Sequence, residues 1–135
     1  MDRILVVDDD QTWRKILGDQ LRSAGYYVDT VSSLAEAMEK LEDQFFHVVI
    51  TDISLDQEKA WNDDGVRLLQ WVRERYPSTK TIAISGRSVS GLDKKGFEVE
   101  YGALQYIERI DFKPRQFLEY VAEAVQLSKE VLEKG

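Results

Sequence analysis

The chain has 135 residues and no cysteine, and its 18 basic and 25 acidic side chains give a formal net charge of −7. This length fits one domain, and the lack of cysteine excludes zinc–thiolate centres, iron–sulfur clusters and thiol catalysis. The negative charge argues against nucleic acid or an anionic membrane surface as a partner, and no apolar run approaches the roughly 20 residues of a membrane span, so we expect a soluble cytoplasmic domain.

The first part of the chain predicts two strand–helix pairs. Residues 4–7 form a short apolar run, which is typical of a strand buried on both faces of a parallel sheet. Apolar residues then recur at helical spacing over 13–24. A weaker apolar run at 28–31 predicts the second strand. A second helix is expected from the apolar stripe Leu34, Met38, Leu41 and Phe45.

The remainder of the chain repeats this alternation. Apolar runs at 48–50 and 82–84 predict the third and fourth strands, with an amphipathic helix over 68–76 between them. A fifth strand is expected over 103–107. The last helix begins at Pro114, because proline fits the first turn of a helix.

Residues 88–102 carry two conflicting patterns. Three glycines weaken a helix, and Phe97 to Tyr101 alternate between apolar and polar side chains as in a strand. The place of this segment in the series nevertheless favours a helix, and we expect one there.

Strand and helix thus alternate five times, which predicts right-handed βαβ units and a doubly wound parallel sheet. The five pairs use up the chain, so residues 1–135 are expected to form a single domain with no output domain. In such sheets the ligand site lies beyond the carboxyl ends of the strands, near the point where the strand order reverses.

Polar side chains gather where the expected strands end. Asp8-Asp9-Asp10 follows the first strand, Asp52 ends the third, and Ser85 ends the fourth. Carboxylates brought together raise each other's pKa, and a divalent cation removes this repulsion. Oxygen ligands without histidine or cysteine favour Mg²⁺ or Mn²⁺. Because such a cation can hold phosphoryl oxygens while a carboxylate acts as nucleophile, the site has the parts for phosphoryl transfer onto an aspartate.

These motifs together resemble the receiver domain of bacterial two-component response regulators, and the resemblance covers nearly the whole chain. It rests on VVDDD, VVITDISL, DDGVRLLQWVR, IAISG and GALQYI in this order. It implies a flavodoxin-like (βα)5 fold with strand order 2-1-3-4-5. It also implies that Asp52 is the phosphoacceptor. Asp9 would bind Mg²⁺ directly and Asp8 mainly through water, and the backbone carbonyl of Ser54 would be a further ligand.

The resemblance also assigns a switch and a phosphate contact. Ser85 would be the hydroxyl that bonds the phosphoryl group, and Tyr106 the aromatic side chain that moves inward with it. Arg109 stands where the family has a lysine, and it can chelate a phosphate in a bidentate way. Lys113 is a substitute that its position disfavours. The loop after Asp52 is longer than in the family and carries Trp61 and the acids Asp56, Glu58, Asp63 and Asp64.

Several of these residues also have simpler interpretations. Asp10 fits a helix cap, since an acid stabilises a helix N-terminus. Ser85 could be a turn residue, Tyr106 a core aromatic, and Arg109 a surface arginine. His47 is the only histidine and has no second ligand, so we interpret it as structural.

The expected function is that of a receiver domain rather than of a standard enzyme. A sensor histidine kinase or a phosphotransfer protein would supply the phosphoryl group to Asp52 with Mg²⁺ present. The surface of the fourth helix, fifth strand and fifth helix would then change for a downstream protein partner, and a homodimer stays open. The alternative, to which Arg109 and the long loop point, is an interaction module that signals without phosphorylation. A metal-dependent phosphatase is disfavoured, because Ser54 stands where its second acid is needed.

Overall fold

The computed structural model describes residues 1–53, 64–86 and 94–134 of the chain. Within these residues strands and helices alternate as the sequence predicts. The elements are β1 (Arg3–Val7), α1 (Gln11–Ser23), β2 (Tyr27–Val31), α2 (Leu34–Asp43), β3 (Val48–Asp52), α3 (Asp64–Arg75), β4 (Lys80–Ser85), α4 (Lys94–Tyr101), β5 (Gln105–Glu108), the short 3-10 helix η1 (Arg109–Asp111) and α5 (Pro114–Lys134).

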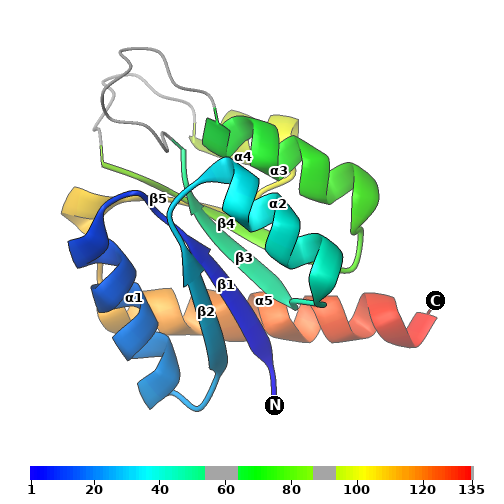
Figure 1. Cartoon of the computed structure of the whole chain (residues 1–135), viewed down its shortest axis with the longest axis horizontal. Helices are drawn as coiled ribbons and strands as arrows, with labels where there is room; N and C mark the ends of the chain where they lie inside the picture. Colours follow the sequence, from blue (N-terminus) through cyan, green and yellow to red (C-terminus); the bar gives the residue numbers. More distant parts are fainter. Residues whose placement is uncertain (54–63, 87–93, 135) are drawn as a thin grey trace.

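The strands form one parallel sheet in the order β2-β1-β3-β4-β5 (Figure 1). This order confirms the doubly wound topology, because the chain moves first to one side of β1 and then back across it to β3. The reversal places the ends of β1 and β3 side by side at the carboxyl edge of the sheet, where parallel α/β proteins hold their ligands.

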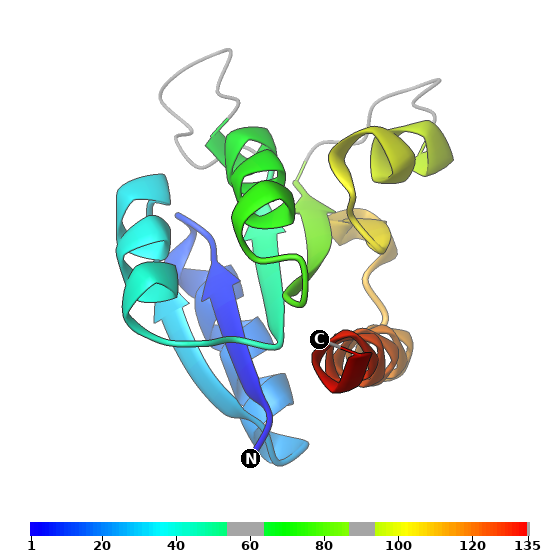
Figure 2. The same ribbon diagram turned by 90° about the vertical axis from the view of Figure 1, so that its right-hand side faces the viewer.

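Helices cover both faces of the sheet, which explains why its central strands contain buried apolar runs. Helices α1 and α5 lie on one face, and α2, α3 and α4 lie on the other (Figures 1 and 2). Along β1 the side chains alternate between the two layers: Ile4 and Val6 pack with α1 and α5, whereas Leu5 and Val7 pack with α2 and α3. All four are completely buried.

Local signals fix where several helices begin. The side chain of Asp10 accepts hydrogen bonds from the backbone N–H groups of Thr12 and Trp13, so the predicted cap of α1 is confirmed. Ser33 caps α2 in the same way through the N–H of Glu36. Pro114 is the first residue of α5, as expected.

The structure corrects the expectation for Phe45 and decides between helix and strand for residues 94–101. Phe45 is not part of the buried stripe of the second helix, because α2 ends at Asp43 and the backbone turns extended at Gln44. Phe45 is therefore exposed and Phe46 is completely buried instead. Residues 94–101 form the helix α4 and not a strand, although no residue of α4 is fully buried. No helix among the described residues is long and apolar enough to cross a membrane.

Candidate functional site

Three aspartates meet at the carboxyl edge of the sheet. Val7 pairs with Thr51 in the register of β1 and β3, so the next residues, Asp8 and Asp52, lie side by side where the two strands end. One carboxylate oxygen from each of Asp8, Asp9 and Asp52 lies within 4.8 Å of the others. The structure thus brings together the three acids that the sequence singles out.

Two of these acids are almost fully shielded from water. Asp8 is 1% exposed and Asp52 is 5% exposed. Burial raises the pKa of Asp8 above its ordinary value, and a hydrogen bond from the Asp10 backbone N–H, 2.9 Å from Asp8 Oδ1, together with Arg109, opposes this rise only in part. A positive charge close to Asp8 therefore stabilises the ionised form of this carboxyl group.

Arg109 supplies such a charge. Its Nη2 donates to Oδ2 of Asp8 at 2.6 Å and to Oδ2 of Asp52 at 3.0 Å. Its Nη1 lies 3.9 Å from Oδ2 of Asp10. The Arg109 side chain is 13% exposed, so it belongs to the site and is not a surface arginine. Lys113, the less favoured substitute, is exposed just before α5.

The path of the chain after β5 explains how Arg109 reaches the acids. Arg109 is the first residue of η1, and the ring of Phe112 just after η1 packs against Trp13 of α1 and Phe117 of α5, with ring centroids 5.3 and 5.2 Å apart. The guanidinium also lies over the Trp13 ring, 5.1 Å from its centroid. The aromatic contacts of Phe112 with the two helices therefore position Arg109 over the site.

Glycine at position 86 leaves room for this arginine. A Cβ atom at Gly86 would come within 2.9 Å of Nη1 of Arg109, which is too close for a real contact.

The start of α3 also requires a glycine. At Gly65 a Cβ atom would lie 2.0 Å from the backbone oxygen of Asp52. The backbone N–H of Gly65 donates to the carbonyl of Ile53 at 2.9 Å, so α3 begins directly beside the end of β3.

The two expected switch residues lie on adjacent strands and are both buried. Ser85 at the end of β4 and Tyr106 in β5 are each 7% exposed. Burial raises the pKa of Tyr106 above its ordinary value, and the nearby Ser85 side chain opposes this rise. The ring of Phe97 lies against Tyr106 with centroids 4.9 Å apart. Tyr106 therefore occupies an inward position beneath α4.

Sequence reasoning missed two neighbours of the site. The sequence marks neither Trp13 nor Arg14 as a site residue, although Nη1 of Arg14 donates to the backbone oxygen of Asp8 at 2.7 Å. The available signal was their place in the first turns of α1, directly after the acids. The remaining assignments, to Ser54, Asp56, Glu58, Trp61 and Asp63, lie outside the described residues.

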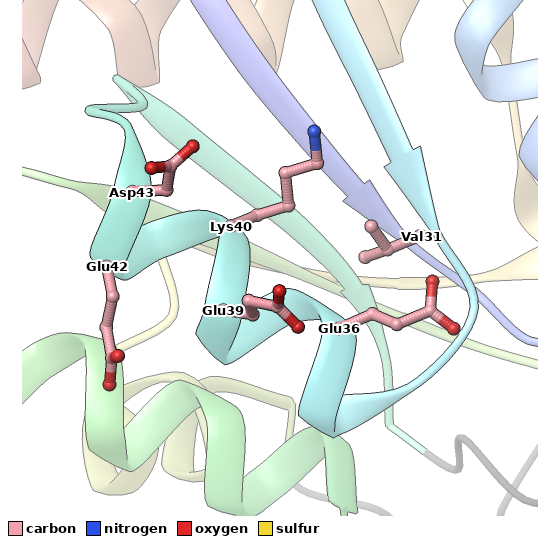
Figure 3. Close-up of a pocket in the computed structure, with 6 residues that line it drawn as sticks. All are labelled: Val31, Glu36, Glu39, Lys40, Glu42 and Asp43. Carbon is pink, nitrogen blue, oxygen red and sulfur yellow. The ribbon is translucent and has the colours of Figure 1, made fainter.

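A hollow beside α2 is a separate feature (Figure 3). Its described lining residues are Val31, Glu36, Glu39, Lys40, Glu42 and Asp43. None of the three site aspartates is among them, and the lining is open and mostly acidic. The chemistry described above therefore lies at the ends of β1 and β3 and not in this hollow.

The family model of the response regulator receiver domain matches residues 4–122 of the chain. The chain belongs to this family. The receiver protein CpdR of Brucella abortus is 32% identical to this receiver domain over 93 residues, which cover 69% of the domain and 73% of CpdR.

Some curated relatives are much longer than this receiver domain. An NtrX-like response regulator of Rickettsia felis is 27% identical over 106 residues, which are 78% of this chain and 21% of the relative. The chain thus spans about a fifth of the length of such a relative, and the match concerns the receiver domain alone.

Solved structures agree with the fold. The CheY-like receiver domain of Methanospirillum hungatei JF-1 has a TM-score of 0.82 and 28% identity, covering 96% of this chain and 98% of that one. The response regulator TrrA of Thermotoga maritima, in complex with Mg²⁺ and beryllofluoride, has a TM-score of 0.75 and 26% identity, covering 92% and 99%. The predicted family and its flavodoxin-like fold are thereby confirmed.

Proposed function

We propose that Asp52 accepts a phosphoryl group from a phosphohistidine on a sensor histidine kinase or on a phosphotransfer protein. One observation carries the proposal: Asp52 is a buried carboxylate at the end of a central strand, with an oxygen within 4.8 Å of oxygens of Asp8 and Asp9. A carboxylate in such a site can attack phosphorus and form an acyl phosphate.

The acids are suited to hold Mg²⁺ or Mn²⁺. Their donors are carboxylate oxygens, which these hard cations prefer, and the burial that raises the pKa of Asp8 makes a positive neighbour favourable. We assign Asp8, Asp9, Asp52 and the backbone carbonyl of Ser54 as ligands, with Asp8 acting mainly through water. A bound cation neutralises charge on the phosphoryl oxygens during transfer.

Phosphoryl transfer forms one bond to phosphorus and breaks another. A carboxylate oxygen of Asp52 bonds to phosphorus while the bond between phosphorus and the donor's imidazole nitrogen breaks, and the electron pair stays on the imidazole. Arg109, whose Nη2 lies 3.0 Å from Oδ2 of Asp52, is placed to donate to oxygens of the attached phosphoryl group.

Ser85 and Tyr106 would pass the modification on to the surface. When the Ser85 hydroxyl bonds a phosphoryl oxygen, its interaction with the nearby Tyr106 side chain changes, and β5 and α4 respond. Two large apolar side chains are exposed around this region, Val99 of α4 at 72% and Ile110 of η1 at 81%. They suit a downstream protein partner, and a second copy of the chain is one such partner.

The test uses Mg²⁺ and a small phosphodonor such as acetyl phosphate. We expect the intact mass of the protein to rise by one phosphoryl group, and we expect no such rise in the Asp52→Asn variant or with EDTA present. Asp19→Asn is the matched control, because Asp19 is an exposed aspartate of α1 that pairs with Lys15 away from the site. A wild-type protein that forms no adduct, with the phosphodonor or with beryllofluoride, contradicts the proposal.

The second candidate function is an interaction module that signals without phosphorylation. The ion pair between Arg109 and Asp52 favours it, because a carboxylate held by a guanidinium is a weaker nucleophile. Partner binding that is unchanged in Asp52→Asn, together with the absence of an adduct, would support this candidate.

Receiver domains are signalling modules, and we propose the same for this chain rather than an enzymatic activity of its own. We place it in the cytoplasm with protein partners. Its net charge of −7 disfavours nucleic acid and anionic membranes as direct partners.

A further inference from the structure

A single nitrogen of Arg109 joins the two buried acids of the site. Its Nη2 is 2.6 Å from Oδ2 of Asp8 and 3.0 Å from Oδ2 of Asp52. These oxygens belong to two of the three residues whose carboxylates are close enough together to share a cation. The guanidinium thus supplies positive charge to Asp8 and Asp52, as a bound metal ion would.

The guanidinium is held in this position from several sides. Trp13 lies beneath it, Gly86 leaves space for Nη1, and Asp10 lies at 3.9 Å. Charge-assisted hydrogen bonds to buried carboxylates are among the stronger ones in proteins. Moving Arg109 away from Asp8 therefore costs free energy, and the binding of another cation has to offset this cost.

Holding both cations at once is unfavourable. A magnesium ligand lies at about 2.1 Å from the ion, and Nη2 of Arg109 is already 3.0 Å from Oδ2 of Asp52, a proposed direct ligand. A guanidinium and a divalent cation that both contact the buried Asp52 carboxylate lie close together and, shielded from water, repel each other. Asp52 therefore exchanges the guanidinium for the ion, and Asp8 exchanges it for a water bound to the ion.

We propose that Arg109 is the built-in counter-ion of the acidic site and competes with the divalent cation for Asp8 and Asp52. The inference rests on the metal site of the proposed function and adds a residue that weakens it. Arg109 sets the concentration of divalent cation at which the site loads. Asp10, already 3.9 Å from Nη1, offers a carboxylate to which the released guanidinium can turn.

The test measures the dissociation constant of Mg²⁺ alone by isothermal titration calorimetry, without any phosphodonor. We expect Arg109→Ala to bind Mg²⁺ at least tenfold more tightly than the wild type. Arg14→Ala is the matched control: Arg14 also touches Asp8, but its Nη1 donates to the backbone oxygen at 2.7 Å and not to the carboxylate. Its loss removes the same charge from a residue that also contacts Asp8, and we expect less than a twofold change.

A second variant protects the test against a folding defect. Arg109→Gln keeps most of the side-chain volume over Trp13 and Gly86 but removes the charge, and it should also bind Mg²⁺ at least tenfold more tightly. Thermal melting provides a readout independent of affinity: at saturating Mg²⁺ the melting temperature should rise more in Arg109→Gln than in the wild type.

Each other outcome overturns the inference in a recognisable way. Equal affinity in the wild type and both Arg109 variants shows that Arg109 does not compete, while the proposed metal site stands. An equal gain in Arg14→Ala shows that only overall charge matters. If neither wild type nor variants bind Mg²⁺, the inference and the proposed function fail together.

Discussion

Arg109 differs from a lysine in the number of directions in which it donates. Its planar group touches Asp8 and Asp52 through one nitrogen and approaches Asp10 through another. A lysine would bring one compact charge on a flexible stem. The arginine therefore ties three acids to one side chain, and this is the property from which its competition with a metal ion follows.

The contacts of His47 favour its neutral form. Its Nδ1 accepts a hydrogen bond from the backbone N–H of Arg3 at 3.1 Å, which only an unprotonated nitrogen can do. Burial lowers the pKa of His47 below its ordinary value, with Lys129 and Arg3 adding to the effect and Asp2 opposing it. The structural interpretation of this histidine agrees with these contacts.

The resulting pH dependence has a definite sign. Because the pKa of His47 is lower in the folded chain, the unfolded chain binds more protons as the pH falls through about 6.5. The contribution of His47 to stability is complete above this pH and is lost below it. We expect urea unfolding to show a loss of stability from pH 7 to pH 5 that is smaller in His47→Gln. Identical slopes in the two proteins would contradict this.

At the scale of elements, the junction between β3 and α3 depends on one glycine. A Cβ atom at Gly65 would lie 2.0 Å from the backbone oxygen of Asp52 and 2.4 Å from that of Ile53. Neither oxygen can move without shifting the end of β3. We expect Gly65→Ala to lower the free energy of unfolding by about 3 kcal/mol or more, measured by urea denaturation.

Gly18 provides the control for this substitution. It lies inside α1, and a Cβ there would meet the flexible end of Arg22 at 3.1 Å. Alanine at this position should be neutral or stabilise the protein by up to about 1 kcal/mol, because it reduces the conformational entropy of the unfolded chain. Equal losses at both glycines would show that the close approach at Gly65 has no special cost.

The elements were predictable where apolar spacing and tertiary packing agree. The strands follow from short apolar runs that only a sheet covered on both faces can bury. Phe45 and Phe46 could not be distinguished, since the choice depends on where α2 ends. Position in the chain favours Arg109 over Lys113, but the inward direction of the Arg109 side chain depends on η1 and on the packing of Phe112.

At the scale of the whole molecule, stability is unevenly distributed. Helix α5 spans 21 residues and buries Phe117, Val121, Ala124, Val125 and Ser128, whereas α4 spans 8 residues and buries none completely. Protection against local opening depends on such buried contacts. In hydrogen–deuterium exchange we expect the amides of α4 to exchange much faster than those in the middle of α5. Similar rates in both helices would mean that α4 is held by contacts stronger than its burial indicates.

The acidic site is also a product of the entire sheet. Asp8 and Arg109 are 101 positions apart in the chain, and their ion pair depends on the pairing of β5 with β4 and on the packing of Phe112 against α1. The acids can be identified from the strand ends, whereas Arg109 is identified only through the family resemblance, and its pairing with the acids depends on the last strand in sequence order.

The contact between Arg109 and Trp13 has a practical consequence. An indole ring 5.1 Å from a guanidinium experiences a strong local field, and its emission depends on that charge. Trp71 packs instead against Arg75 and Tyr76, on the other side of the sheet from Trp13. The chain therefore contains an indole next to its acidic site, and we expect Trp13, one of the three tryptophans of the chain, to report events at Asp52 through its fluorescence in the unlabelled protein.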